Sequence, residues 1–579
     1  VRRVLTSFVR VLATAEHPLV LFIDDLQWAD SDSLEALRVI CEAACTHLLV
    51  VVGYRENEVD PGHPLVAFLD SLRRADFEPL TLRLGPLDRA HVRELVEETV
   101  APTGGAVSAL AGLVHEKTHG NPFFVRQLLH SLYDDGLLRF DPRESSWTFE
   151  LEAIGRVGIT DNVIELMTRR LALLPADAQG LLELAACLGA EFELHTLAVV
   201  EGRAHADIAA SLSSAREQGL VVRVGDSGSE ARYRFLHDRV RQAAHERMPE
   251  SRRAEHHLRI GRFLLAEGGD EVDAVNHLNL GSARVEDRAE RVRLAELNLV
   301  AGRRAKSSNA FDAASHYLDA GLDLLPEEAF ESCYSLALAL HVEAAEAAFG
   351  RGDADRVARH SEVVLANART ILERVPIHTL EIRAGIARGG YAGAVDLALE
   401  VLRELGVALP RHPGALDFGR ALVSTHAAIG RRAPAALVDL PDLREEKVAA
   451  AMTILQSAAS CAYFAEPKLV PLIACTMVRL SLEHGNCGRS AYGYALYGLA
   501  LAGPLHRIEE GYAFGELALA VLERYPAREL VTVRLVVGAF ISHYKEPLAK
   551  VSLDMLDAWR RSLDVGDIET AVYCTGAAL

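Results

Sequence analysis

Aromatic residues are scarce in this sequence, at 6% of 579 residues, and no two of its eight cysteines have the CxxC spacing. No nearby cysteine or histidine pair completes a zinc site, so reduced thiols in a cytoplasmic protein explain the cysteines better. Long apolar runs are also lacking. The longest, near residues 491–505, is too short to span a bilayer and contains Pro504. We therefore expect neither a disulfide scaffold nor a membrane segment.

Positive charge is in deficit: 61 Lys and Arg residues face 81 Asp and Glu residues, giving a formal net charge of −20. A broad negative field repels phosphate backbones, so we expect no nucleic-acid binding by this segment. Alanine and leucine are abundant, which favours helices. A chain of this length exceeds what one hydrophobic core usually supports, and three or more domains are expected.

The first 86 residues alternate between strand and helix patterns. Fully apolar runs predict buried strands over 19–24 and 48–54, with a helix over 33–45 between them. The stretch EPLTLRLGPL predicts a third, shorter strand that ends at Gly85 and Pro86. Short buried strands alternating with helices indicate a parallel α/β sheet. The strand ends should then lie at the same edge of the sheet.

The remainder of the chain is predicted to be mostly helical. Residues 88–135 show helical spacing with breaks near 102–105 and 120–122, and a hairpin pattern around GDSGSE suggests a winged helix within 136–250. Beyond residue 251 only helices are expected. Small residues at Ala310, Gly352 and Gly390 mark turns spaced by 42 and then 38 residues, close to the tetratricopeptide unit of about 34 residues. A helical solenoid accounts for this pattern best.

The segment LVLFIDDLQWADSDSLEAL has the pattern of a Walker B strand, an apolar run that ends in an acidic pair. At the carboxyl end of such a strand, Asp24 would hold Mg²⁺, usually through water, and Asp25 would polarise the attacking water. A plainer interpretation is a buried strand that ends in an acidic turn, with Asp30 or Ser31 capping the next helix.

The same segment resembles the Walker B region of the STAND class, the signal-transduction ATPases with numerous domains. More specifically, it resembles the ATPase module of large bacterial kinases, in which a serine/threonine kinase domain precedes the module and sensor and histidine-kinase domains often follow it. Three further stretches match landmarks of this class in the order that it requires: LLVVVGYRENEVD, KTHGNPFFVRQLL and YRFLHDRVRQAA.

The resemblance implies a role for one or two residues in each stretch. Arg55 would be a sensor arginine that reaches the γ-phosphate, and Gly120 and Pro122 would form a lid turn near the adenine. His237, followed by Asp238, would contact the β-phosphate of ADP in the resting state. Each also has a plainer interpretation: an arginine in a surface ion pair, a turn between helices, and a capping or salt-bridge pair.

One departure from the family concerns the phosphate-binding loop, because nothing in the sequence matches G-x-x-x-x-G-K-[ST]. In the family this loop lies well upstream of Walker B, and the chain opens inside an amphipathic pattern and ends abruptly. We therefore expect an excerpt of a longer protein, which alone binds nucleotide weakly and hydrolyses ATP negligibly. No glycine-rich kinase loop, H-R-D run or DFG is present.

These observations predict a multidomain fold: a partial α/β P-loop NTPase core over 1–86, a helical lid over 87–135, a winged-helix domain over 136–250 and tetratricopeptide-like repeats over 251–579. The expected function is a regulatory ATP/ADP switch with Mg²⁺, whose repeats bind protein partners and which oligomerises in response to nucleotide. One alternative is a LuxR-type transcription regulator resembling the maltose-regulator group. The other is a scaffold that does not hydrolyse ATP.

Overall fold

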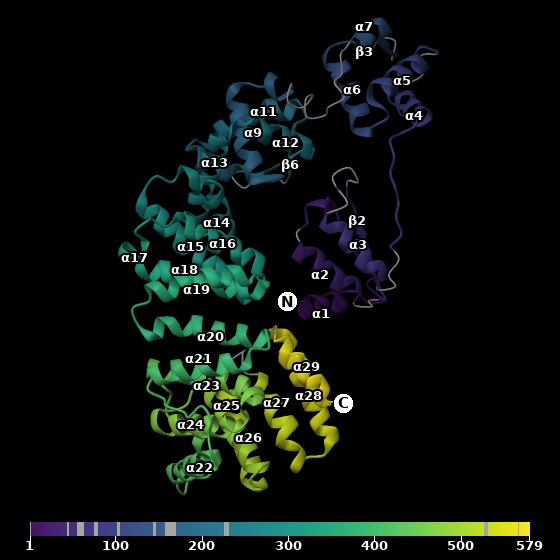
Figure 1. The fold of residues 1–579 in the computed structure, drawn as a ribbon. Helices are drawn as coiled ribbons and strands as arrows, with labels where there is room; N and C mark the ends of the chain where they lie inside the picture. The colour runs from purple at the N-terminus through teal and green to yellow at the C-terminus, as the bar shows by residue number, and fades with distance from the viewer. Residues whose placement is uncertain are drawn as a thin grey trace. The chain divides into compact units, whose positions relative to one another are not determined.

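The computed structural model describes residues 2–29, 31–42, 46–54, 59, 63–74, 79–100, 105–142, 146–156, 170–224, 231–525, 531–565 and 567–578. The chain divides between Glu290 and Arg291 into two compact units, and each is described by itself. Figure 1 shows the order of the elements along the chain.

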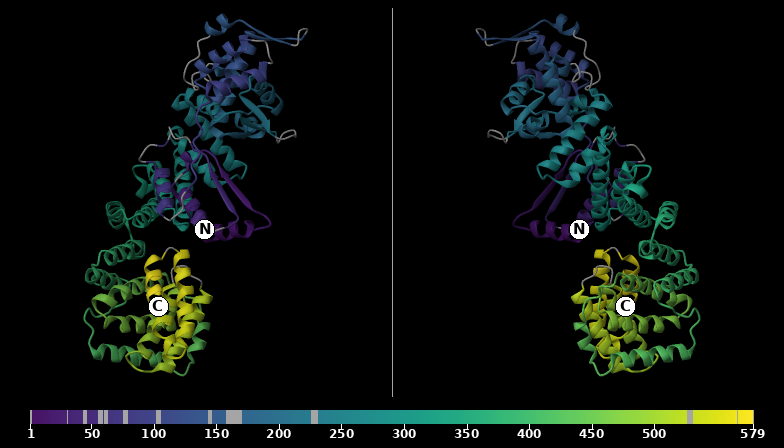
Figure 2. Two further views of the ribbon diagram at one scale, coloured as in Figure 1. Left: turned by 90° about the vertical axis from the view of Figure 1, so that its right-hand side faces the viewer. Right: turned by 90° about the vertical axis from the view of Figure 1, so that its left-hand side faces the viewer.

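The first part of the chain contains a parallel pair of strands between helices. Its elements are α1 (Arg2–Leu12), β1 (Leu19–Ile23), the 3-10 turn η1 (Leu26–Trp28), α2 (Ser31–Glu42), β2 (Leu48–Val52) and α3 (Pro64–Arg74). The strands pair in register from Leu19 opposite Leu48 to Ile23 opposite Val52, and Figure 2 shows them side by side. The predicted parallel pairing of these two runs is confirmed.

The two faces of this strand pair differ in their surroundings. Alternate side chains such as Leu21 and Val50 pack against a cluster that includes Leu34 and Leu65 of the flanking helices. On the other face Val20, Phe22 and Leu49 are 61%, 63% and 57% exposed. The sequence pattern suggested strands buried on both faces, but among the described residues helices pack against only one of them.

The predicted third strand is wrong. No strand forms in residues 79–88, and Leu80, Leu82 and Leu84 are 88%, 79% and 97% exposed. The alternating leucines fit a strand pattern, but a strand exists only when a neighbour supplies its hydrogen bonds. Within the described part of the chain, the sheet that holds β1 and β2 has no third member.

A helical segment, predicted from the sequence to be the lid, follows, and a hairpin that was not predicted packs with it. The elements are α4 (Arg89–Val100), α5 (Gly105–Thr118), α6 (Pro122–Asp134), β3 (Leu138–Asp141), β4 (Ser146–Phe149) and α7 (Leu151–Arg156). One cluster joins Val96, Leu110 and Val125 of the helices to Leu138 and Ile154. The packing of the lid therefore continues beyond residue 135.

The next part combines helices with a small antiparallel sheet in the strand order β5-β7-β6. Its elements are α9 (Ala176–Leu188), β5 (Glu191–Glu193), α10 (Leu194–Glu201), α11 (His205–Glu217), β6 (Val221–Val224), β7 (Arg232–Phe235) and α12 (Asp238–Arg247). Phe192 contacts Tyr233 and Phe235, with ring centroids 6.0 and 5.4 Å apart. The predicted hairpin between the two β-rich runs is confirmed, since β6 pairs with β7.

From residue 250 onward the described residues form helices, apart from short turns and one isolated bridge, which confirms the predicted helical region (Figures 1 and 2). They are α13 (Glu250–Ala266), α14 (Glu271–Leu280), α15 (Arg288–Ser307), α16 (Phe311–Leu324), α17 (Ala329–Ser332), α18 (Tyr334–Arg351), α19 (Ala354–Asn367), α20 (Ile371–Ala387), α21 (Tyr391–Glu404), α22 (Ala415–Ile429), α23 (Glu446–Ala465), α24 (Leu469–His484), α25 (Gly488–Ala502), α26 (Ile508–Arg524), α27 (Val531–Phe540), α28 (Leu548–Val565) and α29 (Ile568–Ala578).

The three turn residues used as repeat markers are not structurally equivalent. Ala310 and Gly390 are the N-caps of α16 and α21, whereas Gly352 ends α18 in the left-handed region at φ 76°. The N-cap of α19 is Asp353, whose carboxylate accepts the amide of Arg356. The equivalent N-cap positions are therefore residues 310, 353 and 390, so the middle marker lies one residue later than predicted.

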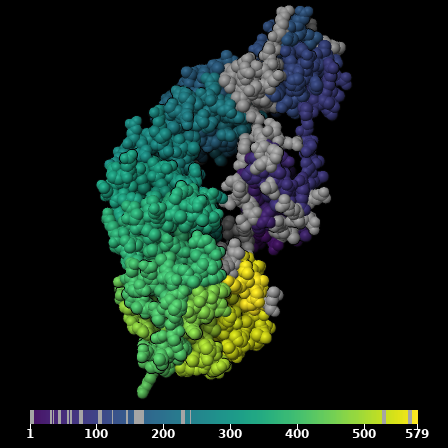
Figure 3. Space-filling view, viewed as in Figure 1, coloured from purple at the N-terminus to yellow at the C-terminus, as the bar shows by residue number. Residues whose placement is uncertain are grey.

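Helix α23 is long and apolar enough to cross a membrane by length and composition. Residues such as Ile454, Leu455 and Ala458 of this helix are buried in a cluster that extends from α20 to α27. In Figure 3 the side chains of the region from α20 to α27, coloured green to yellow, form a continuous surface. A buried core helix passes the same test of length and hydropathy, and the expected absence of a membrane segment stays a prediction.

Candidate nucleotide site

Gly53 connects the ends of β1 and β2. Its amide donates to the carbonyl of Ile23 and its carbonyl accepts the amide of Leu26, both at 2.8 Å. A Cβ atom at position 53 would lie 2.5 Å from Oδ1 of Asp24. Only glycine therefore leaves Asp24 where it stands. Gly53 was not among the predicted site residues, although its place at the end of the second apolar run could have drawn attention to it.

Asp24 and Asp25 leave the carboxyl end of β1 in different environments. Asp24 is exposed, and its Oδ1 accepts the amide of Asp25 at 3.0 Å. Asp25 is half-buried in the left-handed region, at φ 52° and ψ 40°. Its Oδ1 accepts Nε2 of Gln27 at 2.9 Å, and Gln27 is only 4% exposed. One carboxylate is thus open to solvent, while a buried amide holds the other.

A magnesium ion suits the exposed carboxylate. Among the described residues, no group of three or more His, Cys, Asp or Glu side chains is placed to hold a metal. Mg²⁺ does not require such a cage, because it usually keeps several waters and binds one or two carboxylates together with substrate phosphates. Asp24 presents oxygen ligands of this kind at the strand end. When bound there, Mg²⁺ would neutralise phosphate charge.

The other predicted residue at this strand edge, Arg55, lies outside the described residues, as does Asp30. The convergence of Arg55 with Asp24 and Asp25 stays a prediction. Residues 53 and 54, which precede it, follow β2 directly.

Gly120 and Pro122 form the turn between α5 and α6. Gly120 has φ +74°, and a Cβ atom there would lie 1.9 Å from the carbonyl oxygen of Leu87. The Leu87 amide donates to the Gly120 carbonyl at 2.8 Å, and the buried Thr118 hydroxyl accepts the Gly120 amide at 3.3 Å. Gly120 therefore ties the entry of the lid to this turn. That packing role holds whether or not the turn also contacts adenine.

His237 lies between β7 and α12, where its carbonyl accepts the amide of Val240 at 2.9 Å. The imidazole is half-buried. Asp238, the first residue of α12, accepts Nε of Arg241 at 2.8 Å. This ion pair is the plainer interpretation of Asp238, and a carboxylate in the first turn also suits the helix dipole.

The predicted residues thus fall into three substructures: Asp24 and Asp25 in the strand pair, Gly120 and Pro122 in the lid, and His237 beside the small sheet. The structure places Asp24 and Asp25 together beside Gly53. The convergence of these three groups on one nucleotide stays a prediction.

Comparison with known proteins bears on the strand pair. Residues 1–52 match the family model of the AAA ATPase domain. This stretch contains α1, β1, α2 and β2, and the match confirms the ATPase segment that the Walker B pattern predicted. The matched residues are a minor part of the chain.

Relatives of known function span much longer chains. Hybrid signal transduction histidine kinase G of Dictyostelium discoideum is 22% identical over 98% of this chain and 21% of its own length. Peroxide stress-activated histidine kinase mak2 of Schizosaccharomyces pombe is 23% identical over 24% of this chain and 6% of its own. The chain therefore spans about a fifth of the first relative.

A solved structure is also similar to the whole chain. It is a Signal Transduction ATPase with Numerous Domains (STAND) protein with a tetratricopeptide repeat sensor from Pyrococcus horikoshii. Its identity is 12% and the TM-score 0.41, with 100% of this chain and 82% of that one covered.

Proposed function

We propose that this chain is the regulatory ATP/ADP-binding switch of a STAND-class signalling protein. The observation that carries the proposal is the pair of carboxylates at the end of β1, where Gly53, directly after the neighbouring parallel strand β2, bonds to the backbone of Ile23 and Leu26 on either side of them. Open α/β sheets bind ligands beyond the carboxyl ends of their strands. An exposed carboxylate at this edge suits Mg²⁺, which binds one or two carboxylates together with substrate phosphates.

Each predicted residue has a role in this proposal. Asp24 holds Mg²⁺ and Asp25 polarises the attacking water, while Arg55 contacts the γ-phosphate. The turn at Gly120 and Pro122 closes near the adenine. The part that contains β5, β6 and β7 acts as a winged helix, from which His237 contacts the β-phosphate of ADP in the resting state.

The helical repeats bind a protein partner, and nucleotide exchange controls oligomerisation in the cytoplasm. The similarity of 98% of the chain to part of a hybrid histidine kinase supports a kinase-type parent over a LuxR-type regulator. The two curated relatives come from a slime mould and a yeast, so a bacterial source and a serine/threonine kinase domain stay predictions.

Nucleotide binding by the full-length protein tests the proposal. Asp24→Asn should weaken Mg²⁺-dependent ATP binding at least about 10-fold, and Asp25→Asn should keep binding but lower hydrolysis about 100-fold. Asp70→Asn is the matched control, because Asp70 lies in α3 of the same segment and pairs only with Arg73 of its own helix at 2.9 Å among the described contacts. Unchanged binding and hydrolysis in both Asp24→Asn and Asp25→Asn would favour the scaffold alternative.

A further inference from the structure

Histidines gather around α13, the helix that follows α12 (Figure 1). His256 and His257 lie in its middle, and each is only 7% exposed. Two half-buried histidines lie close to His257 from the helices before and after it, His245 from α12 and His277 from α14. The charge of a histidine ordinarily changes between pH 5 and 8, and burial disfavours its charged form. Several groups that respond to acid therefore meet at one contact between helices.

His257 and His277 form a pair across the α13–α14 hairpin. Their Nδ1 atoms lie 2.9 Å apart, and their ring centroids 5.1 Å. At this distance one Nδ1 donates its proton and the other accepts it, so the accepting nitrogen must carry no proton of its own. Once both Nδ1 atoms are protonated, neither can accept, and two positive rings face each other. The contact therefore tolerates one added proton and not two.

The two rings have little room to move apart while the helices stay together. One turn after His257, Gly261 lets α14 approach closely, because a Cβ atom there would lie 2.6 Å from Cγ of Leu278. Among the described residues, α14 packs mainly on α13, with a smaller contact to the 3-10 turn η4 (Ser282–Arg284). Repulsion between the rings therefore acts on the main contact that holds α14.

The surroundings of the pair favour its neutral form. Burial, and after it the charges of His277 and His245, lowers the pKa of His257 to about 4. Burial also lowers the pKa of His277, although Asp273, one turn earlier in α14, raises it. For His245, burial and then Arg253 lower the pKa. The charged residue of η4, Arg284, is exposed.

His256 lies at a different contact of α13, near Glu183 of α9 and Glu201 of α10. Neither of its ring nitrogens has a hydrogen-bond partner among the described residues, and burial lowers its pKa. The same two carboxylates pair with Arg252 and Arg259 of α13, at 2.9 and 3.2 Å. Carboxylates ordinarily titrate near pH 4, so these ion pairs persist at pH 5 and keep α13 attached to α9 and α10.

We propose that the α13–α14 hairpin is an acid-responsive switch, in which a second proton on the His257–His277 pair releases α14 from α13. The chain continues from α14 into the second compact unit, which begins at Arg291. Release of α14 would therefore lengthen the free connection between the two compact units. The inference goes beyond the proposed nucleotide switch and does not depend on it.

The direction of the response follows from the difference between the two states. A histidine exposed by the release of α14 titrates near pH 6.5, whereas His257 in the closed hairpin titrates near pH 4. The closed hairpin is therefore fully favoured above about pH 6.5 and loses stability as the pH falls from there towards 4. At pH 5, His257 alone lowers the ratio of closed to open hairpin about 30-fold relative to pH 7.

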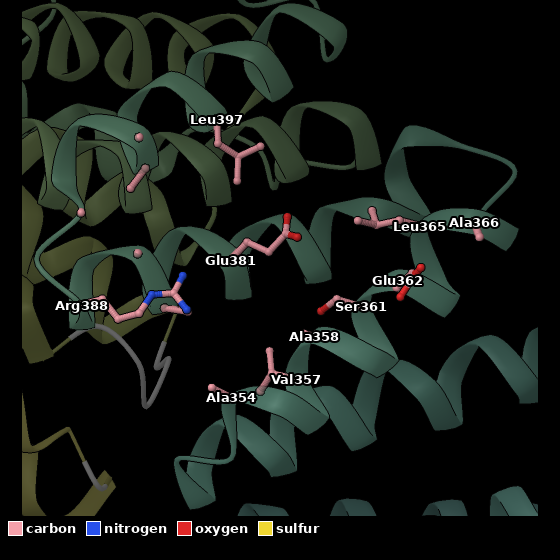
Figure 4. A pocket seen from close by; sticks show the side chains of 15 residues that line it. Ala354, Val357, Ala358, Ser361, Glu362, Leu365, Ala366, Glu381, Arg388 and Leu397 are labelled. Atoms are coloured by element: carbon pink, nitrogen blue, oxygen red, sulfur yellow. The ribbon is translucent and has the colours of Figure 1, made fainter.

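Hydrogen exchange measured by mass spectrometry tests this in the full 1–579 chain without nucleotide. After correction for the intrinsic pH dependence of exchange, the amides of α14 should lose at least about 30-fold of their protection between pH 7 and pH 5. Helix α21 is the internal control, because it contains no histidine and lines a cavity of about 860 Å³ with α19 and α20 (Figure 4). Its protection should change less than about 3-fold.

Paired asparagine variants identify the groups that respond. In His257→Asn/His277→Asn the side-chain amides can still hydrogen-bond but cannot take up a proton, so the loss of protection in α14 should shrink below about 3-fold. His195→Asn/His205→Asn is the matched control in the same compact unit. It alters the histidine pair between α10 and α11, whose ring nitrogens lie 3.2 Å apart. This control should keep the full response of α14.

Three results would overturn the proposal. They are unchanged protection of α14 in the wild-type chain at pH 5, an equal loss in α14 and α21, and a full response in His257→Asn/His277→Asn. The first two need no variant, so they stand even if the double variant does not fold. Nucleotide binding by the aspartate variants is measured separately and does not affect this outcome.

Discussion

The strand pair β1–β2 and the helical core around α23 bury apolar residues to very different extents. In the strand pair, Phe22 is 63% exposed on the face opposite the flanking helices. In the helical core, Tyr494 and Ile454 are both 0% exposed within one cluster that extends from α20 to α27. The difference follows from where each type of element finds partners for its backbone hydrogen bonds. A helix forms its hydrogen bonds within itself, whereas a strand depends on neighbours on both edges and both faces.

The largest expected effect tests the helical side of this comparison. Tyr494→Ala removes a fully buried ring that contacts Phe514 and a hydroxyl that donates to Oδ1 of Asn486 at 2.9 Å. We expect the free energy of unfolding to fall by about 4 kcal/mol in urea titrations. Tyr463→Ala, at 56% exposure, is the control and should cost less than about 1 kcal/mol. Similar losses in both variants would mean that the cluster is not a continuous core.

Acid should weaken the helical part through half-buried histidines at contacts between helices. His341 of α18 and His360 of α19 have their Nδ1 atoms 3.0 Å apart, and burial, together with the His360 charge, lowers the pKa of His341 to about 4. An unfolded histidine titrates near pH 6.5. Because the folded pKa lies below the unfolded one, this stability is complete above about pH 6.5 and is lost as the pH falls from there towards 4.

We expect the loss to be about 2 kcal/mol, measured by urea unfolding at pH 7 and at pH 4.5. In His341→Gln this part of the pH dependence should disappear. His412→Gln is the control, since the side chain of His412 is 76% exposed and lies 2.9 Å from Glu466. An identical pH dependence in wild type and His341→Gln would show that this pair does not contribute.

A smaller effect is expected where the two strands meet. Gly53→Ala places a Cβ atom 2.5 Å from Oδ1 of Asp24, and the carboxylate can rotate away from it at little cost. Stability should therefore change by less than about 1 kcal/mol, while Mg²⁺-dependent ATP binding by the full-length protein falls about 10-fold. Calorimetry with and without Mg²⁺ measures both. If the Mg²⁺ dependence of ATP binding is the same in Gly53→Ala and wild type, Asp24 does not bind the metal.

The smallest effect tests the uncovered face of the strand pair. Phe22→Thr changes a side chain that is 63% exposed, so the free energy of unfolding should change by no more than about 0.5 kcal/mol. Phe68→Ala is the matched comparison, because Phe68 is 7% exposed in the same segment and its loss should cost about 3 kcal/mol. A cost above about 1.5 kcal/mol for Phe22→Thr would mean that this face is covered.

The sequence predicted elements best where their signals are local. The runs at 19–23 and 48–52 were recognised because continuous apolar stretches that end in charge are typical of buried parallel strands. The helices beyond residue 250 were recognised from their spacing, because a helical pattern does not depend on a distant partner. Asp24 and Asp25 followed from the same strand pattern.

Features that depend on distant contacts were missed. Residues 79–88 have strand-like spacing but no partner strand in the described part of the chain. The hairpin of β3 and β4 was not foreseen either, although its Trp147 contacts Tyr133 of α6, with ring centroids 5.9 Å apart. Gly53 was missed because its importance lies in the space that Asp24 occupies, which no single-sequence pattern reveals.

The left-handed backbone of Asp25, at φ 52° and ψ 40°, determines which substitutions a selection experiment would recover. Asparagine and glycine tolerate this conformation, whereas longer or branched residues strain it. A library at position 25 selected for folding alone should therefore return Asp, Asn and Gly. The same library selected for signalling should return Asp. Glutamate would be depleted under both selections, even though it keeps the charge. The enrichment of Asp over Asn in the signalling selection would therefore measure how much function depends on that carboxylate.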